Sequence, residues 1–323
     1  MLPNTILKNQ LKFTLDKTDF KFGKKYEGKV RDNYSFDGKR IIITTDRISA
    51  FDRVLCSIPF KGQVLNQTSE FWFEKTRKIV DNHLISIPDP NVMLAKECKP
   101  LPVEMVVRGY ITGVTTTSAW YNYERDVRNF CGNILPEGLR KNQKLAKPII
   151  TPSTKAEHGA HDESISGEKI IKRKLVDKKV YSQMEKVSLK LFDFGTKLVA
   201  KNNLILVDTK YEFGELNGKL VLIDEIHTPD SSRFWINDTY GELFSKRQEP
   251  QKLDKEYVRM WLSNRGFIGE GKIPEIPDEV KVEAAKRYIT AYEMITGNLF
   301  DAENENVLER IGKNLGKIFS ATF

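Results

Sequence analysis

Alternating apolar and polar residues predict β-structure in the first third of the chain. The stretch YEGKVRDNYSF alternates, and KRIIITT is apolar again after the pair Asp37-Gly38. An Asp-Gly pair between two such runs is a strong signal for a β-hairpin. The stretch EMVVRGYITG, residues 104–113, predicts another strand that ends in glycine.

Helical spacing replaces this alternation further along the chain. Residues 178–202 place Val187, Leu191, Phe194 and Leu198 on one side of a helix. Three more helices are expected at about 254–265, at about 279–296 and from about residue 303. Mixed strands followed by helices indicate an α+β fold.

Two irregular segments interrupt the pattern. The proline-rich stretch SIPDPNVMLAKECKPLPVE suits a connector, so we expect two lobes, residues 1–102 and residues 103–323. Residues 147–168 have neither a helical nor a strand period and are polar. A loop of that length in a compact domain is usually functional or disordered.

Length, composition and charge narrow the class of protein. The chain has 323 residues, enough for two cores, with 40% hydrophobic and 30% charged residues, which is typical of a soluble globular protein. Its longest apolar runs fall short of the roughly 18 residues of a membrane helix. The three cysteines are far apart, so we expect reduced thiols in a cytoplasmic protein.

The net charge of +8 has several possible explanations. The charges are interspersed and no basic block stands out, which argues against nucleic acid as a partner. A small polyanion such as a nucleotide, or no partner at all, explains the excess equally well. The oligomeric state is left open between a monomer and a homodimer.

An unusually charged segment, residues 206–235, is predicted to be a hairpin around Asn217-Gly218. Because side chains alternate along a strand, Asp208, Lys210 and Glu212 share one face. An exposed polar face on an ordinary hairpin is one explanation. A catalytic face is the other.

The register of this hairpin decides which carboxylates meet. A two-residue loop pairs Glu212 with Ile223, whereas a loop of odd length pairs Glu212 with Asp224. Adjacent carboxylates repel unless a cation lies between them, and Mg²⁺ typically uses one or two carboxylates together with substrate phosphates. We therefore expect the odd loop, with Glu212 and Asp224 as ligands of a shared Mg²⁺.

Basic residues near glycines suggest anion binding at two further places. Gly28 precedes Lys29 and Arg31, an arrangement that suits a polyphosphate, although a solvated strand face explains it as well. Arg108 follows two valines and precedes a glycine, which indicates either bidentate capture of an anion or a structural ion pair.

A third cluster follows a predicted strand in TTDRISAFDRVL. Asp46, Arg47, Ser49 and Asp52 gather there, and local capping with ion pairing is the simplest explanation. The four histidines lack the spacing of a zinc site.

Six motifs in order give the chain a specific resemblance. GKVRDNY, TTDRISAFD, PVEMVVRGYITG, TPSTKAEHGAHDES, LVDTKYEFG and LIDEIHTPDSSRFW together closely resemble the SAICAR (phosphoribosylaminoimidazole-succinocarboxamide) synthetase family, in its longer form. The resemblance runs from about residue 20 to about residue 300. It implies a smaller antiparallel N-terminal lobe over a larger α+β lobe, with ATP in the cleft, as in protein kinases and ATP-grasp enzymes.

The resemblance also implies a reaction of purine biosynthesis. ATP would phosphorylate the carboxylate of carboxyaminoimidazole ribonucleotide, and the amine of L-aspartate would attack the acyl phosphate, giving the succinyl amide SAICAR, ADP and phosphate. Positioning and charge neutralisation supply most of the catalysis in phosphoryl transfer. A closing loop would exclude water from the acyl phosphate.

Roles for individual residues carry over with the motifs. Lys210 and Asp208 are the implied catalytic pair, and Gly28, Lys29, Arg31, Glu212 and Asp224 the implied Mg·ATP site. The implied substrate-binding residues are Arg108, Ser118, Lys155, Asp162, Asp230, Ser232, Arg233, Ser49 and Asp52.

One departure from the family pattern lies next to the predicted strand at 104–113. Many members read glycine directly followed by SAW, whereas here Val114 to Thr117 are inserted. The serine role near the nucleotide substrate therefore belongs either to Ser118 or to a threonine beside it.

Two other functions fit parts of the sequence. A small-molecule kinase would use the same glycine, basic residues and carboxylates, but gives no reason for Arg108, Arg233 and the TPSTKAE loop together. A basic nucleic-acid-binding protein would show steeply salt-dependent binding, which the interspersed charge disfavours.

Overall fold

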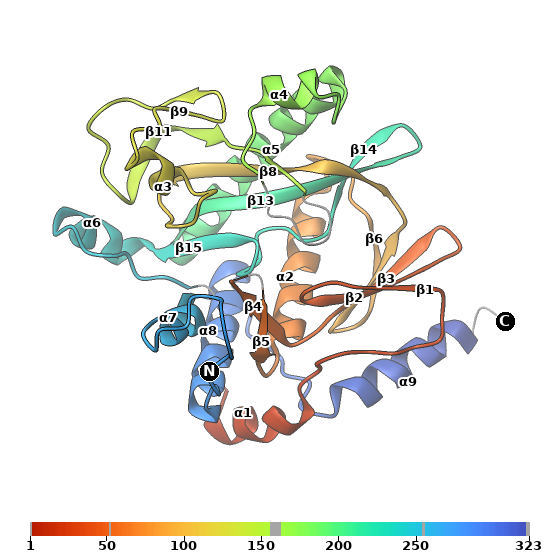
Figure 1. The fold of residues 1–323 in the computed structure, drawn as a ribbon. Helices are drawn as coiled ribbons and strands as arrows, with labels where there is room; N and C mark the ends of the chain where they lie inside the picture. The colour runs from red at the N-terminus through yellow and green to blue at the C-terminus, as the bar shows by residue number, and fades with distance from the viewer. Residues whose placement is uncertain (1, 52, 156–162, 254–255, 321–323) are drawn as a thin grey trace.

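Two antiparallel sheets face each other across a central helix in this computed structural model (Figure 1). The structure describes residues 2–51, 53–155, 163–253 and 256–320. Strands and helices are segregated in the manner of an α+β fold, so the expected fold class is confirmed.

The first sheet contains the predicted N-terminal hairpin. In spatial order it consists of β1 (Lys24–Glu27), β2 (Arg31–Phe36), β3 (Lys39–Thr44), β7 (Val92–Lys96) and β6 (Leu84–Asp89). Phe36 pairs with Lys39, and Asp37 and Gly38 both have positive φ, at 44° and 69°. This is the two-residue turn that an Asp-Gly pair favours.

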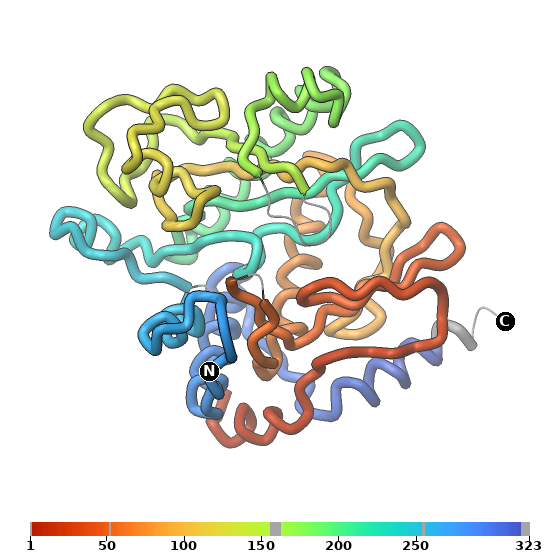
Figure 2. The backbone as a smooth tube through the Cα atoms, viewed as in Figure 1, coloured from red at the N-terminus to blue at the C-terminus, as the bar shows by residue number. Residues whose placement is uncertain are grey.

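Helices bury both faces of the first sheet. Ile42 packs into the core around α2 (Lys61–Thr76), while its neighbours Ile41 and Ile43 pack against α9 (Val307–Ser320). Successive strand residues point to opposite faces, which explains why this strand is apolar without interruption. Figure 2 shows the C-terminal segment running beside the N-terminal one beneath this sheet.

The second sheet carries most of the charged segment. Its order is β11 (Gln143–Ile150), β8 (Lys99–Ile111), β13 (Leu204–Leu216) and β14 (Lys219–Ile223), with β12 (Ser153–Thr154) on β8 and β15 (Ser232–Ile236) on β13. The amphipathic helix α5 (Lys178–Val199) packs on one face through Leu191 and Phe192. Leu191 and Phe192 share a core with Val107 of β8 and Leu206 of β13.

The remaining elements are short strands and helices around the two sheets. They are α1 (Asn4–Gln10), the 3₁₀ turns Leu11–Phe13 and Ala200–Asn202, β4 (Arg47–Ala50), β5 (Arg53–Ser57), α3 (Ala119–Tyr123), β9 (Asn129–Phe130), β10 (Asn133–Ile134), α4 (Gly167–Lys172), α6 (Asn237–Ser245), α7 (Glu256–Ser263) and α8 (Asp278–Thr296). The four predicted helices correspond to α5, α7, α8 and α9.

The polar segment 147–168 is more ordered at its ends than its sequence suggests. β11 extends to Ile150, β12 follows, and α4 begins at Gly167. The expectation that no strand enters this segment is therefore wrong, because β11 and β12 both pair with β8. Residues 156–162, including Asp162, lie outside the described residues.

Packing links the two ends of the chain. α8 shares a core with α1 and α2, and α9 covers the first sheet. The division at residue 102 stays a prediction, and the C-terminal helices contact residues on the N-terminal side of it. No helix within the described ranges is long and apolar enough to cross a membrane.

The hairpin between β13 and β14 differs from the expectation. Leu216 pairs with Lys219, so Glu212 pairs with Ile223 and not with Asp224. Asn217 and Gly218 have φ values of 52° and 74°, the left-handed pair that a two-residue Asn-Gly turn adopts. The predicted loop of odd length is wrong, because local turn chemistry sets the register.

Two buried histidines bring titratable groups into the core. His227 Nε2 and the hydroxyl of Tyr211 share a hydrogen bond of 2.6 Å, and the imidazole tautomer decides which of them donates. The other ring nitrogen, Nδ1, has no partner among the described residues. Burial lowers the pKa of His227 from 6.5 to about 3, and burial, followed by the charges of Arg40 and Arg31, lowers the pKa of His83 to about 3 as well. Both imidazoles are therefore neutral in the folded protein at neutral pH.

This neutrality predicts acid sensitivity. Below pH 6.5 the unfolded chain binds a proton at His227 that the folded chain excludes until about pH 3, so the free energy of unfolding falls as the pH falls through that window. His227→Gln should reduce the slope by about 1.4 kcal/mol per pH unit. Urea unfolding of both proteins between pH 4 and pH 6 measures it, and equal slopes would contradict the assignment.

Candidate active site

A cleft of about 270 Å³ opens beside β8, β13 and β15. Seven of the predicted site residues line it: Arg108, Ser118, Asp208, Lys210, Asp230, Ser232 and Arg233. Five of them come from adjacent antiparallel strands, because β8 and β15 both pair with β13. Sheet register thus brings together residues that lie more than a hundred positions apart in the sequence.

Asp208 lies between two arginines in the cleft wall. Arg233 donates to both of its oxygens, from Nε to Oδ1 at 2.8 Å and from Nη2 to Oδ2 at 2.6 Å, and Arg108 Nη1 lies 3.3 Å from Oδ2. The cross-strand partners of Asp208 are these same two residues. The carboxylate therefore orients two guanidinium groups toward one region of the cleft.

Arg108 is held in three directions. Its Nε donates to Thr151 Oγ1 and its Nη2 to the carbonyl of Thr117, both at 2.8 Å, in addition to its contact with Asp208. Burial lowers its pKa, the charge of Asp208 opposes that effect, and the neighbouring Arg233 adds to it. A rigid, partly desolvated guanidinium next to a second one is a strong site for an anion.

Lys210 and Glu212 form the centre of a second charge cluster. The Lys210 ammonium donates to Glu212 and, at 2.9 Å, to Glu104 on the neighbouring strand. Lys155 donates to the other oxygen of Glu212 at 2.5 Å. Burial acts against it, but Lys210 and Lys155 together lower the pKa of Glu212, so this carboxylate is ionised.

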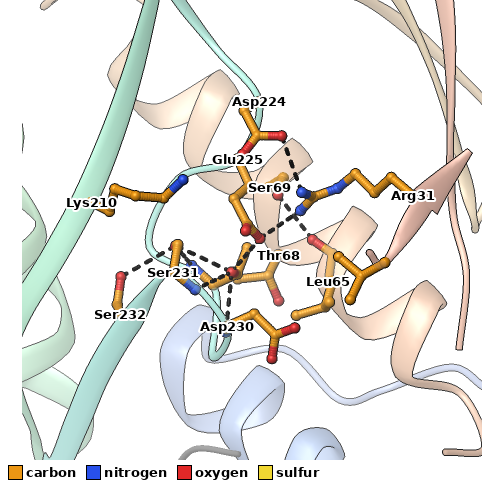
Figure 3. Close-up of polar contacts among 12 residues, drawn as sticks. Arg31, Leu65, Thr68, Ser69, Lys210, Asp224, Glu225, Asp230, Ser231 and Ser232 are labelled. Carbon is orange, nitrogen blue, oxygen red and sulfur yellow. Dashed lines mark hydrogen bonds and ion pairs between the residues drawn. The ribbon is translucent and has the colours of Figure 1, made fainter. Parts of the chain in front are cut away.

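Asp224 follows the end of β14 and turns toward the first sheet. It has a positive φ of 67°, and its Oδ1 accepts from Arg31 Nη1 at 3.0 Å, while Arg31 Nη2 lies 2.6 Å from Glu225 (Figure 3). Burial would lower the pKa of Arg31, but Asp224 and Glu225 outweigh it and raise that pKa. Arg31 thus connects β2 of the first sheet to the loop after β14.

The turn at Gly28 is held by an arginine that sequence analysis had assigned to local pairing. Arg47 donates to the carbonyls of Gly28 and Lys29 at 2.9 and 3.0 Å, and to Asp32 at 2.8 Å. Both side chains of the Arg47–Asp32 pair are buried. The exposed side chain of Lys29 therefore projects from a backbone turn with a fixed conformation.

The inserted residues 114–117 shape one wall of the cleft. Ser118 Oγ lies 2.7 Å from Thr115 Oγ1, and the carbonyl of Thr117 binds Arg108. Gly113 has a φ of 94°, and a Cβ there would lie only 2.4 Å from Ser118 Oγ. Both hydroxyls named as alternatives by sequence analysis, Ser118 and a neighbouring threonine, are thus at the cleft.

The other predicted residues lie in several places. Ser232 donates to Thr209 at 2.7 Å and Asp230 faces the cleft, whereas Ser49 is half-buried in the β4–β5 hairpin and is not among the residues lining the cleft. Asp52 and Asp162 lie outside the described residues.

Two carboxylates fit a hard divalent cation. Glu212 and Asp224 do not pair in the sheet. Burial raises the pKa of Asp224, the charge of Arg31 opposes that effect, and the nearby charge of Glu212 adds to it. The described part of the chain contains no group of three or more His, Cys, Asp or Glu side chains arranged for a metal. Two carboxylates with the remaining positions left to phosphate and water are typical of Mg²⁺.

Sequence analysis missed or misread three of these residues. The sequence does not mark Glu104, does not show that Arg47 holds the turn at Gly28, and does not show that Lys61 is fully buried against Asp230. No hydrophobic periodicity reveals these three residues. A charged residue is normally expected at the protein surface until its buried partner is located. A cation inside an otherwise apolar motif, as in IPFKGQVL, is the only available signal.

Comparisons with known proteins agree on one family. A sequence model of the SAICAR synthetase family matches residues 24–274. A phosphoribosylaminoimidazole-succinocarboxamide synthase of Legionella pneumophila is 48% identical over 312 residues, covering 94% of this chain and 99% of the relative.

Solved structures agree as well. The SAICAR synthase of Saccharomyces cerevisiae complexed with SAICAR superposes with a TM-score of 0.78 at 31% identity, covering 90% of this chain and all of the other. A type-2 SAICAR synthetase in complex with ADP gives a TM-score of 0.65 at 25% identity, covering 86% of this chain and all of the other.

The relatives define the class of this α+β protein with a strongly charged cleft: it is a carbon–nitrogen ligase of purine biosynthesis. The chain belongs to the SAICAR synthetase family. The resemblance drawn from the six motifs is thereby confirmed.

Proposed function

We propose that this enzyme joins L-aspartate to the carboxylate of carboxyaminoimidazole ribonucleotide through an acyl phosphate. ATP supplies the phosphoryl group, and the products are SAICAR, ADP and phosphate. The arrangement of charge in the cleft carries the proposal: Arg108, Arg233 and Lys210 converge there, beside the carboxylates Glu212 and Asp224. The SAICAR and ADP complexes of the structural relatives support the same substrates.

The two arginines around Asp208 suit the anionic groups of the nucleotide substrate. Arg108 and Arg233 are already oriented by one shared carboxylate, so binding an anion requires little rearrangement of either side chain. Ser118 would add a neutral hydrogen bond at the same end of the cleft, and Ser232 and Asp230 line its neighbouring wall.

The turn at Gly28 and the second charge cluster suit ATP. Lys29 would contact phosphates from the turn that Arg47 holds, and Arg31 would join it from β2. Glu212 and Asp224 would hold Mg²⁺, which shields phosphate charge when it is bound. Arg31 and Lys155 are paired to those two carboxylates in this structure, so each carboxylate already has a cationic partner at the place proposed for the metal.

Lys210 would neutralise the phosphoryl group during transfer. In the first step the substrate carboxylate oxygen attacks the γ-phosphorus, and the bond to the ADP oxygen breaks. Lys210 has a raised pKa, since Glu212 and Glu104 outweigh the opposite effect of burial, so it keeps its positive charge throughout. Fixed charge of this kind stabilises the transition state without reorganisation.

The second step forms the amide. The aspartate amine, formed when its ammonium loses one proton, attacks the carbonyl carbon of the acyl phosphate. The C–N bond forms, phosphate leaves, and the nitrogen loses a second proton to the medium and keeps one in the amide. Water would hydrolyse the acyl phosphate, so the site must exclude it during this step. Lys155, in the TPSTKAE motif, is already paired to Glu212 and would hold its positive charge beside the reacting groups.

The proposal predicts that ADP release requires all three substrates. Purified enzyme with Mg²⁺, ATP and the imidazole nucleotide should release ADP in proportion to added L-aspartate, with a succinyl amide detected by mass spectrometry. ADP release that continues unchanged without aspartate, or a stable phosphorylated product, would identify a kinase instead.

Loss of a proposed metal ligand should change the Mg²⁺ requirement. Glu212→Gln should raise the Mg²⁺ concentration needed for half-maximal rate by at least roughly tenfold, with little change in thermal stability. A loss of about tenfold in affinity is typical when a residue that only supports a metal ligand is removed, and loss of a ligand itself should cost no less. Glu104→Gln is the matched control, because it removes the other carboxylate on Lys210 without removing a proposed ligand. An equal Mg²⁺ requirement in both variants would exclude Glu212 as a ligand.

A lysine should not replace Arg108. A point charge cannot reproduce donation to Thr151, Thr117 and Asp208 at once, so Arg108→Lys should lose about 2 kcal/mol, roughly thirtyfold, in kcat/KM. Arg40→Lys serves as the control, since Arg40 makes a similar two-pronged pair with Glu97 on the first sheet. Normal kinetics in Arg108→Lys would refute the role.

A further inference from the structure

Lys61 is a charged side chain with no exposed surface. It is the first residue of α2, and its ammonium donates to Asp230 Oδ2 at 2.8 Å. The Asp230 side chain is 7% exposed, so the ion pair is almost completely desolvated. A buried pair of this kind is weak evidence for stability, because hydrophobic residues of the same volume often do as well. Its presence at the cleft therefore requires another explanation.

Tyr288 holds the other oxygen of the same carboxylate. Its hydroxyl donates to Asp230 Oδ1 at 2.6 Å, and its ring lies 5.4 Å from the Lys61 ammonium. Tyr288 belongs to α8 and Lys61 to α2, and these two helices pack against each other. A counter-ion for Lys61 would need only one contact, whereas donors on both oxygens fix the plane of the carboxylate.

Asp230 lies in the loop between β14 and β15. Figure 3 shows it below Ser231, on the same loop as Asp224 and Glu225. Its backbone N–H donates to Thr228 Oγ1 at 3.3 Å, and it lines the cleft with Ser232. Lys61 and Tyr288 thus reach the cleft through this one carboxylate, from helices that do not themselves line it.

We propose that Lys61 and Tyr288 are positioning residues that fix the Asp230 carboxylate as a hydrogen-bond acceptor for a donor group of a substrate. A hydroxyl of the nucleotide and the ammonium of aspartate share this chemistry. The inference rests on the proposed function, since it requires a polar substrate in the cleft. It adds a function for α8, a helix that contributes no residue to the cleft wall.

The test begins with removal of one oxygen atom. Tyr288→Phe should raise the KM of the nucleotide or of L-aspartate, whichever donates to Asp230, by roughly tenfold, with a smaller change in kcat. Measuring the two KM values separately identifies the donor. Tyr292→Phe is the matched control, because Tyr292 lies one turn further along α8 and its ring packs against Phe300.

A double-mutant cycle separates positioning from general stability. In an Asp230→Ala background, Tyr288→Phe should have no further effect on kcat/KM, because the group that it orients is gone. Lys61→Met, which keeps the side-chain length, should show the same non-additivity if it folds. Melting temperatures from circular dichroism report the structural effect of each variant independently.

The kinetics of these variants decide whether Lys61 and Tyr288 position Asp230. Unchanged KM values in Tyr288→Phe, or an equal loss of kcat/KM with and without Asp230, would overturn the inference while the wild-type enzyme remains active. Absence of aspartate-dependent ADP release in the wild type would overturn the proposed function and the inference together. A KM increase that disappears in the Asp230→Ala background supports it.

Discussion

Neutralisation of buried carboxylates is the constraint on which the cleft depends. β13 and the loop after β14 carry the partly or fully buried carboxylates Asp208, Glu212 and Asp224, and each is paired with a cation from another element. An unpaired carboxylate in such a position would cost several kcal/mol. These ion pairs therefore connect different strands and loops to one another, and the same charged groups lie in or beside the cleft.

This pairing also prepares the site for ligands. Cations that already hold carboxylates are desolvated and oriented before a substrate arrives, so little reorganisation is required. Arg108 and Arg233 illustrate this, since one carboxylate aligns both. When a charged substrate binds, these cations would exchange a carboxylate of the protein for an anionic group of the substrate. The free-energy cost of desolvating them on binding would therefore stay small.

Local signals in the sequence indicate strands, helices and hairpin turns, but not which distant elements meet. The Asp37-Gly38 turn and the helix at 178–199 follow from neighbouring residues alone, and the structure has both. At Asn217-Gly218 a shared metal would require a loop of odd length, but the structure has the register that the two turn residues favour. Local backbone preference is fixed by two residues, whereas the position of a metal depends on the whole cleft.

Contacts between segments that lie far apart in the sequence could not be predicted from it. The run at Ile41 to Ile43 indicates burial on both faces, and Val307, Ile311 and Leu315 indicate a helix, but nothing in either segment shows that they meet. The candidate site followed the same rule. Strand alternation placed Asp208, Lys210 and Glu212 together, while the buried cations Arg47 and Lys61 gave no sign of their carboxylate partners.

The position of α9 has a consequence for how the chain folds during synthesis. One face of the first sheet, with Tyr34, Ile41 and Ile43, is covered by a helix that begins only at Val307, far later in the chain. Until residues 307–320 have left the ribosome, that apolar face is covered only in part, by Leu15, Phe20 and Phe22 of the N-terminal segment. The N-terminal sheet therefore cannot complete its core early, and apolar surface stays exposed for most of translation.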